Sequence, residues 1–250
     1  MAEPAAILLK IRRRERPDSR PYWQEFSVPA APNMNIVAAL MEIQKNPVDA
    51  RGRATVPVVW DCNCLEEVCG ACTMLINGQA RQACSALVET LTQPIVLQPL
   101  TKFPVVRDLM VDRQSIFESL KKVRAWIQMD GSHDQGPGPR VSPSLQAWTY
   151  ELSRCMTCGC CMEACPQVNG RSPFIGPAVL AQVRRFNAHP LGESIRAERL
   201  RAVMGPGGIT DCGKAQNCER ACPKQLPLTR ALAELNRETI THGLFGWLSR

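Results

Sequence analysis

The sequence lacks any apolar run long enough to cross a membrane, since no segment approaches about eighteen uninterrupted apolar residues. The first residues, MAEPAAILLKIRRR, place no basic residue ahead of their short apolar stretch, which argues against a secretory signal peptide. We therefore expect a chain that does not span a membrane by itself and that works in a reducing compartment.

Histidine is scarce, and no grouping of His, Asp and Ser side chains of a catalytic kind is recognisable. The three histidines are His133, His189 and His242, and we expect each to be structural or solvated rather than a metal or haem ligand. His189 precedes Pro190 at a predicted helix end, where it can interact with the helix dipole. The sequence thus predicts no catalytic residue.

Cysteine, by contrast, is abundant, with thirteen in 250 residues. All but Cys84 lie in three short segments, 62–72, 155–165 and 212–222. Secreted disulfide scaffolds are shorter and spread their cysteines along the chain, whereas clumped cysteines suit metal ligation. The hydrophobic content of 45% and the charged content of 21% indicate a globular chain that can bury a core.

The formal net charge of +7 counts every cysteine as neutral. If eleven cysteines are thiolates around oxidised iron–sulfur cores, about −11 from sulfur and about +5 from the cores leave a net charge of about +1. RRRER at 12–16 is interpreted as a solvated strand end. We therefore expect no nucleic-acid partner.

The first hundred residues predict a mixed β-sheet that holds one helix. NIVAALMEIQKN, residues 35–46, has helical spacing and begins with an Asn suited to the N-cap. A sheet of this kind around one helix is the β-grasp arrangement. Strands are expected at 6–13, 22–29, 55–60 and 94–100, and a hairpin at 73–84 with Asn77-Gly78 at its turn.

The remainder of the chain is predicted to be helical, which makes the fold class α+β. We place the domain boundary so that residues 1–105 form the first domain and residues 106–250 the second. The later cysteine segments fall between helices. Helices are expected at 115–127, 144–154, 176–188, 193–204 and 228–244, with a Gly- and Pro-rich loop at 128–143.

The first cysteine motif has the spacing C-x4-C-x2-C-x11-C, which is the plant-type [2Fe-2S] pattern. A zinc site is the alternative, although structural zinc usually uses two separated two-residue knuckles. Gly70 lets the loop backbone approach a cluster, and Cys62 is interpreted as a non-ligand. The predicted [2Fe-2S] ligands are Cys64, Cys69, Cys72 and Cys84.

The second motif, CMTCGCCMEACP at 155–166, is the ferredoxin run C-x2-C-x2-C-x3-C-P, whose fourth cysteine binds the other cluster in two-cluster ferredoxins. CGKAQNCERACP at 212–223 repeats this run with Ala215 in place of its second cysteine. Spacing favours Cys161 over Cys160 as the ligand. The predicted [4Fe-4S] ligands are Cys155, Cys158, Cys161 and Cys222, and those of the other cluster are Cys165, Cys212 and Cys218.

Ala215 leaves that last cluster with three thiolates, which support a [3Fe-4S] centre of raised reduction potential. One alternative is a [4Fe-4S] cluster whose open iron acts as a Lewis acid on a substrate. The other is the use of the leftover cysteines for zinc or a disulfide.

Together these motifs resemble the iron–sulfur subunit of succinate dehydrogenase and fumarate reductase over nearly the whole chain. FPVVRDLMVDR at 103–113 is similar to the family's connector between its halves. WDCNCLEEVCGAC and CPQVNG resemble the bacterial branch that pairs with one di-haem cytochrome b and uses menaquinone. The resemblance implies an N-terminal β-grasp [2Fe-2S] ferredoxin-like domain followed by an all-helical two-cluster ferredoxin-like domain.

The resemblance also implies a function, that of succinate:quinone oxidoreductase (respiratory complex II). Electrons would pass from the FAD of a flavoprotein subunit through [2Fe-2S], [4Fe-4S] and [3Fe-4S] to menaquinone at a cytochrome membrane-anchor subunit with haem b. The chain would lie on the cytoplasmic side of a bacterial cell membrane. The alternatives are a fumarate reductase subunit running in the opposite direction and, in another class, a soluble ferredoxin-like carrier or cluster-sensing module.

Two positions depart from the ubiquinone-type relatives. Those relatives have a Trp shortly after the position of Pro166 and a His after the position of Cys212, and both can contact quinone. Here the neighbourhoods contain QVNG and Gly213. The resemblance therefore assigns no quinone-contacting residue to this chain.

Overall fold

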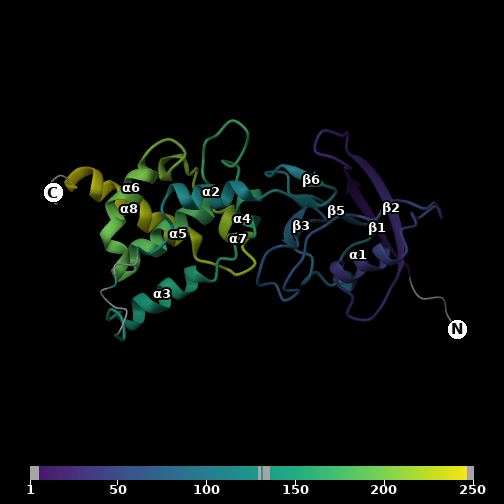
Figure 1. Cartoon of the computed structure of the whole chain (residues 1–250), viewed down its shortest axis with the longest axis horizontal. Coiled ribbons are helices and arrows are strands. Elements are labelled where there is room, and N and C mark those ends of the chain that lie inside the picture. The colour runs from purple at the N-terminus through teal and green to yellow at the C-terminus, as the bar shows by residue number, and fades with distance from the viewer. Residues whose placement is uncertain (1–5, 129–130, 132–135, 247–250) are drawn as a thin grey trace. The chain divides into compact units, whose positions relative to one another are not determined.

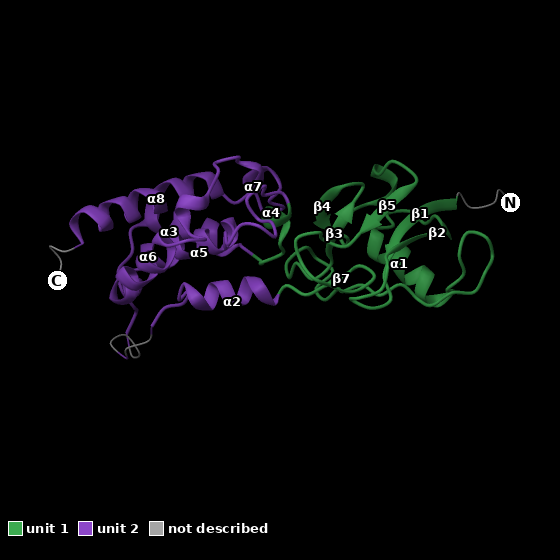
Figure 2. Ribbon diagram, turned by 90° about the horizontal axis from the view of Figure 1, so that it is seen from above, with its two compact units in different colours: residues 1–113, 156–163 green, residues 114–155, 164–250 purple. Residues whose placement is uncertain are grey.

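The computed structural model describes residues 6–128, 131 and 136–246, which form two compact units (Figure 2). The first unit comprises residues 1–113 together with 156–163, and the second comprises 114–155 together with 164–250. The ferredoxin run is therefore divided, because Met156–Glu163 belongs with the first unit while Cys155 and Cys165 belong with the second.

The first unit is built on a five-stranded mixed sheet with the strand order β2-β1-β5-β3-β4 (Figure 1). The central pair β1 and β5 is parallel, and the other neighbouring strands are antiparallel. A separate two-stranded ribbon, β6-β7, follows. The strands are β1 Ala6–Arg13, β2 Tyr22–Pro29, β3 Thr73–Ile76, β4 Gln79–Gln82, β5 Ile95–Gln98, β6 Val105–Arg107 and β7 Met110–Val111.

One helix, α1 (Ile36–Lys45), shares a hydrophobic core with this sheet. Alternate residues of β1 are buried because side chains along a strand point to opposite faces in turn. The side chain of Asn35 accepts a hydrogen bond from the Ala38 N–H at 2.9 Å, so the predicted N-cap and the predicted helix at 35–46 are confirmed. The core includes Ile7, Leu9 and Ile11 of β1 and Ile36, Leu40 and Ile43 of α1.

The predicted hairpin is confirmed as β3-β4. Asn77 and Gly78 have φ values of 48° and 81°, which is the backbone that a two-residue hairpin turn of this kind requires. The predicted strands at 6–13 and 22–29 are also confirmed, and that at 94–100 forms the shorter β5.

The strand predicted at 55–60 is wrong, since no strand forms there. Pro57 has no N–H to donate to a sheet ladder. Side chains satisfy this backbone instead: Arg13 donates to the Val56 and Pro57 carbonyl oxygens at 3.1 and 3.2 Å, and the Val59 N–H donates to Asp108 at 2.9 Å.

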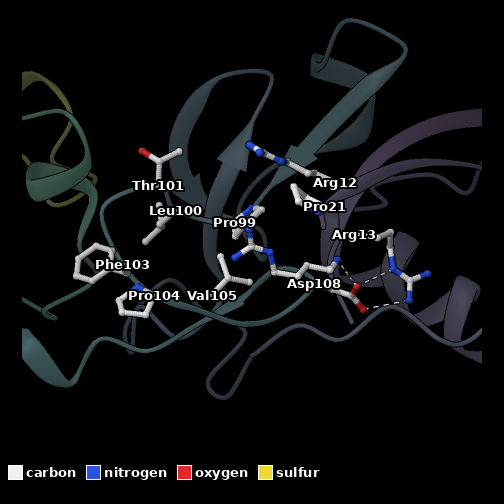
Figure 3. A pocket seen from close by; sticks show the side chains of 11 residues that line it. Arg12, Arg13, Pro21, Pro99, Leu100, Thr101, Phe103, Pro104, Val105 and Asp108 are labelled. Atoms are coloured by element: carbon white, nitrogen blue, oxygen red, sulfur yellow. Dashed lines mark hydrogen bonds and ion pairs between the residues drawn. The ribbon is translucent and has the colours of Figure 1, made fainter. Parts of the chain in front are cut away.

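Arg13 and Asp108 form a buried ion pair that joins β1 to the β6-β7 turn (Figure 3). The guanidinium donates to both carboxylate oxygens, at 2.9 and 3.1 Å, and both side chains are almost completely buried. The pair lies beside a pocket of ≈ 360 Å³ that contains no cysteine. Through its hydrogen bonds to residues 56–59, the Arg13–Asp108 pair fixes the segment that leads into the first cysteine loop.

The second unit is helical, as predicted. The helix expected at 115–127 ends at Lys122, because Arg124 adopts a left-handed φ of 53°. The longest helix, α8, packs against α5, and Arg184 of α5 (Pro177–Ala188) forms ion pairs with Glu234 and Glu238 of α8 (Leu228–Phe245). The helices of this unit are α2 Gln114–Lys122, α3 Pro143–Ser153, α5 Pro177–Ala188, α6 Arg196–Met204, α7 Asn217–Arg220 and α8 Leu228–Phe245, and the first unit contains α4 Cys160–Glu163.

Within the part of the chain that the structure describes, no helix combines the length and apolarity needed to cross a membrane. Of the histidines, His189 caps the 3-10 turn Pro190–Ile195, with its Nδ1 accepting the Leu191 N–H at 3.2 Å. His242 lies in the last turn of α8, and His133 lies outside the described residues.

Candidate functional site

The first cysteine loop directs its backbone N–H groups at sulfur. Cys64 Sγ accepts from the N–H groups of Glu66, Val68 and Cys69 at 3.3–3.4 Å. The Glu67 N–H donates to Cys84 Sγ at 3.3 Å, and the N–H groups of Cys64 and Ala71 donate to Cys69 Sγ at 3.5 and 3.4 Å. Donors gathered in this way stabilise a thiolate and tune a cluster bound to it.

The loop reaches this arrangement through left-handed backbone conformations. Leu65 and Glu67 have φ values of 63° and 56°, and Gly70 has 69°. Alternation of left- and right-handed residues turns successive N–H groups to one side, which forms an anion-binding concavity of the kind seen at iron–sulfur sites. The sequence analysis singled out Gly70 alone in this loop, for a close approach of the backbone to a cluster, because nothing in Leu or Glu indicates a positive φ.

The surroundings of the four thiols differ. Three backbone hydrogen bonds lower the pKa of Cys64 to about 7, whereas burial raises the pKa of Cys72 to about 12. Cys72 and Cys84 are buried, and Cys64 and Cys69 are partly exposed. Cys62, interpreted as a non-ligand, is exposed, and none of the hydrogen bonds described for the loop reaches its sulfur.

The second run is split between the two units. Cys158 and Cys161 are buried in the first unit, and Cys155 and Cys222 lie partly exposed in the second. Each unit therefore contains two of the four cysteines predicted as [4Fe-4S] ligands.

Cys160 is completely buried at the start of α4, where the Gln82 amide donates to its sulfur at 3.6 Å. Its thiol also hydrogen-bonds Cys158, which lowers the pKa of Cys158 to about 7 and raises that of Cys160. This environment keeps Cys160 protonated and gives it a donor's role beside Cys158.

The third group lies entirely in the second unit and shares one pocket. Cys165, Cys212 and Cys218 all line it, and so does Ala215. Lys214 and Gln216, on either side of Ala215, have left-handed φ values of 54° and 60°. The structure thus brings together the three cysteines predicted to hold the [3Fe-4S] centre.

A side-chain amide holds the two loops of this pocket together. Asn217 Nδ2 donates to the Ala164 carbonyl at 3.2 Å, joining the residue before Cys165 to the residue before Cys218. Gln167 lies so close to Gly213 that a Cβ at Gly213 would approach its Nε2 to 2.6 Å. Gln167 begins the QVNG stretch and Gly213 follows Cys212, so this contact joins the two neighbourhoods where the sequence departs from the ubiquinone-type pattern.

The donor set fits iron–sulfur clusters. Among the described residues, no three His, Cys, Asp or Glu side chains converge closely enough to hold a single metal ion. Clusters distribute their thiolates over several irons joined by sulfide, so they do not require such convergence. A bound cluster also needs hydrogen-bond donors for the negative charge on its sulfur atoms, and the N–H groups of the positive-φ loops provide them.

Two domain models match the chain in the order that this geometry suggests. A 2Fe-2S iron-sulfur cluster binding domain matches residues 8–118, and a 4Fe-4S dicluster domain matches residues 151–226. Fold and motifs together define a protein with a ferredoxin-type β domain and a helical dicluster domain.

Whole-chain comparisons narrow this class. The chain is 57% identical to the succinate dehydrogenase iron-sulfur subunit of Bacillus subtilis, over 96% of this chain and 94% of that one. It is 31% identical to the fumarate reductase iron-sulfur subunit of Wolinella succinogenes, over 89% and 92% of the two chains. The fold matches a chain of the Mycobacterium smegmatis Sdh1 complex in the apo form with a TM-score of 0.78, 22% identity and coverage of 94% and 96%.

The chain therefore belongs to the family of succinate dehydrogenase and fumarate reductase iron–sulfur subunits. The resemblance stated from the motifs is confirmed at the level of the family, and so are the fold class and the ferredoxin-type and dicluster domains.

Proposed function

We propose that this chain is the electron-transferring subunit of a succinate:menaquinone oxidoreductase. It would accept electrons from a flavoprotein subunit that oxidises succinate with FAD, and pass them to menaquinone at a di-haem cytochrome b subunit. The observation that carries the proposal is the pocket of the second unit, which is lined by Ala215 and by the three cysteines predicted to hold the third cluster.

Three clusters, [2Fe-2S], [4Fe-4S] and [3Fe-4S], would each supply reversible one-electron chemistry at the cysteines assigned to them. The chain's own residues hold the sulfur atoms and stabilise their negative charge. In the first loop, backbone N–H groups do this by donating hydrogen bonds to the sulfur atoms of Cys64, Cys69 and Cys84.

The exposure of the third site supports a terminal position in the relay. Residues 213–216, which line the pocket, are all exposed. A centre near the surface can approach an acceptor on another subunit. A centre with one thiolate fewer also has less negative charge around it, which favours its reduction.

The chain would be attached to the membrane through its partners. The cytochrome subunit would hold it on the cytoplasmic face of a bacterial cell membrane. Co-purification with a flavoprotein and a b-type cytochrome tests this assignment. Isolation as a monomer with no partner would instead favour a soluble ferredoxin-like carrier.

Low-temperature EPR of the purified complex tests the cluster assignment. We expect a [3Fe-4S] signal in the oxidised protein that disappears on reduction, and a [2Fe-2S] signal that appears with dithionite. Iron and acid-labile sulfide near zero, or the signal of one centre alone, would contradict the proposal.

Fumarate reduction is the second candidate, because a relative with that name is 31% identical over 89% of the chain. The 57% identity to a succinate dehydrogenase subunit favours succinate oxidation. The ratio of the two rates in the purified complex, measured with menaquinone and menaquinol analogues, distinguishes the two directions.

A further inference from the structure

The first cysteine loop touches the segment that contains Cys158, within the first unit. A Cβ on Gly70 would lie 2.7 Å from Cys158 Cβ and 2.9 Å from Cys158 Cα, well inside van der Waals contact. It would also lie 3.2 Å from the Met156 carbonyl oxygen. Gly70 is buried and stands next to Cys69, so the missing side chain allows two predicted cluster ligands on different loops to approach each other.

Arg113 spans this contact. Its Nη1 donates to the Gly70 carbonyl at 2.5 Å and to the Cys158 carbonyl at 3.4 Å. Arg113 is partly buried. One guanidinium is thus hydrogen-bonded to the backbone of both loops.

A second polar connection lies beside the first. Gln82 donates to Thr73 Oγ1 at 3.0 Å and to Cys160 Sγ at 3.6 Å, so it links the hairpin that follows Cys72 to the start of α4. Both Gln82 and Cys160 are fully buried. The contact between the loops is therefore supported from two sides.

We infer that Gly70 and Arg113 are positioning residues for electron transfer between the [2Fe-2S] and [4Fe-4S] centres, an inference that rests on the proposed function. Gly70 allows the close approach through which the electron passes between the loop of Cys69 and that of Cys158. Arg113 holds the approach and, by its charge, stabilises the reduced, more negative form of both centres. Neither residue is a ligand.

The glycine is tested by Gly70→Ala against Gly78→Ala in the purified complex. Both glycines have positive φ, 69° and 81°, but a Cβ at Gly78 would meet nothing within 4 Å. The readout is microwave power saturation of the reduced [2Fe-2S] EPR signal, whose relaxation is enhanced by a nearby paramagnetic centre. We expect Gly70→Ala to weaken this enhancement or to lose the signal, and Gly78→Ala to keep the wild-type behaviour.

The arginine is tested by potentiometric titration of the two EPR signals in Arg113→Gln, Arg113→Lys and the control Arg53→Gln. Arg53 pairs with Asp49 in a loop and makes no described contact with a cysteine. We expect Arg113→Gln to shift both midpoint potentials downward, Arg113→Lys to restore them, and Arg53→Gln to leave them unchanged.

Equal saturation in the two glycine variants, or potentials in Arg113→Gln that match those of Arg53→Gln, would overturn the inference. The proposed function would survive that result as long as the unmodified complex shows the [3Fe-4S] and [2Fe-2S] EPR signals. It would fall, by contrast, if those signals were missing from the unmodified protein.

Discussion

Ala215 occupies the position at which the preceding ferredoxin run has Cys158, and it lines the pocket together with three cysteines. Restoring a thiol there supplies the missing ligand. We expect Ala215→Cys to replace the oxidised [3Fe-4S] EPR signal with that of a reduced [4Fe-4S] centre and to lower its potential, because a thiolate adds negative charge. Spectra of the as-isolated and the dithionite-reduced variant provide the measurement.

Ala215→Ser is the matched control for this substitution. It adds a polar atom of similar size but no thiolate, so the [3Fe-4S] signal should persist. If Ala215→Cys also kept the wild-type signal, the alignment of the two cysteine runs would be wrong.

Arg13 contributes to the stability of the fold through an ion pair with Asp108 that is buried in the interior. Its side chain is 1% exposed and that of Asp108 is 0%, so removing one charge strands the other in the interior. We expect Asp108→Asn to lower the free energy of unfolding by about 3–5 kcal/mol, the usual cost of breaking a buried pair. The midpoint of urea denaturation of the loaded protein under anaerobic conditions measures this loss.

The exposed pair of Lys45 and Glu42 provides the comparison. Their side chains are 66% and 34% exposed, so Lys45→Gln should cost less than about 1 kcal/mol. Similar losses in the two variants would show that the Arg13–Asp108 pair has no special weight in the fold.

Among the elements, the 3-10 turn Pro190–Ile195 depends on a histidine cap. Burial, helped by the charge of Arg185, lowers the pKa of His189 below its usual 6.5. The folded chain thus binds fewer protons here than the unfolded chain does, so this contribution to stability is full above pH 6.5 and declines as the pH falls toward the folded pKa. We expect His189→Asn, which keeps a capping acceptor, to reduce the fall in thermal midpoint between about pH 7.5 and about pH 5.5.

His242→Asn removes a histidine from the last turn of α8 and serves as the control. It should retain the pH dependence of the unsubstituted protein. A slope in His189→Asn as steep as that in His242→Asn would mean that the cap does not titrate as expected.

For the whole molecule, cluster binding should decide whether the cysteine loops are ordered. Between α6 and α8 the chain contains only short elements, the 3-10 turn Ile209–Asp211 and α7. Ligand binding stabilises a folded state that the apo chain reaches less readily. We expect Lys214 to resist trypsin in the loaded protein and to be cleaved after a chelator has removed the iron.

Lys45 in α1 is the internal reference for this digestion. It is exposed in a helix that packs on the sheet and belongs to no cysteine loop, so its cleavage should change little. Equal cleavage at Lys214 with and without iron would mean that the loop keeps its order without a cluster. Mass spectrometry of the fragments identifies each cut.

The limits of the two predicted domains, 1–105 and 106–250, stay a prediction. The compact units follow the chain differently, since residues 156–163 belong with the sheet. Unfolding followed separately by the [2Fe-2S] and the remaining absorption bands would show which division behaves as a cooperative unit.

Local patterns in the sequence predicted most of the helices and strands. Asn35 caps α1 and Asn77-Gly78 turn the β3-β4 hairpin because both depend on residues within a few positions of each other. The prediction for residues 55–60 was wrong, because their apolar pattern suggested a strand. Pro57 and hydrogen bonds to the distant Arg13 and Asp108 determine the conformation of this segment instead.

Cysteine spacing within short loops was enough to predict an iron–sulfur protein, and equally local patterns were enough to predict most of its helices and strands. The folded chain was needed to show that Cys165, Cys212 and Cys218 line one pocket. It was also needed to show that Gly70 meets Cys158 and that Arg113 is hydrogen-bonded to both of their loops. The contacts of Gly70 and Arg113 join residues 43 or more positions apart, through a guanidinium and a missing Cβ whose partners no periodicity or spacing reveals.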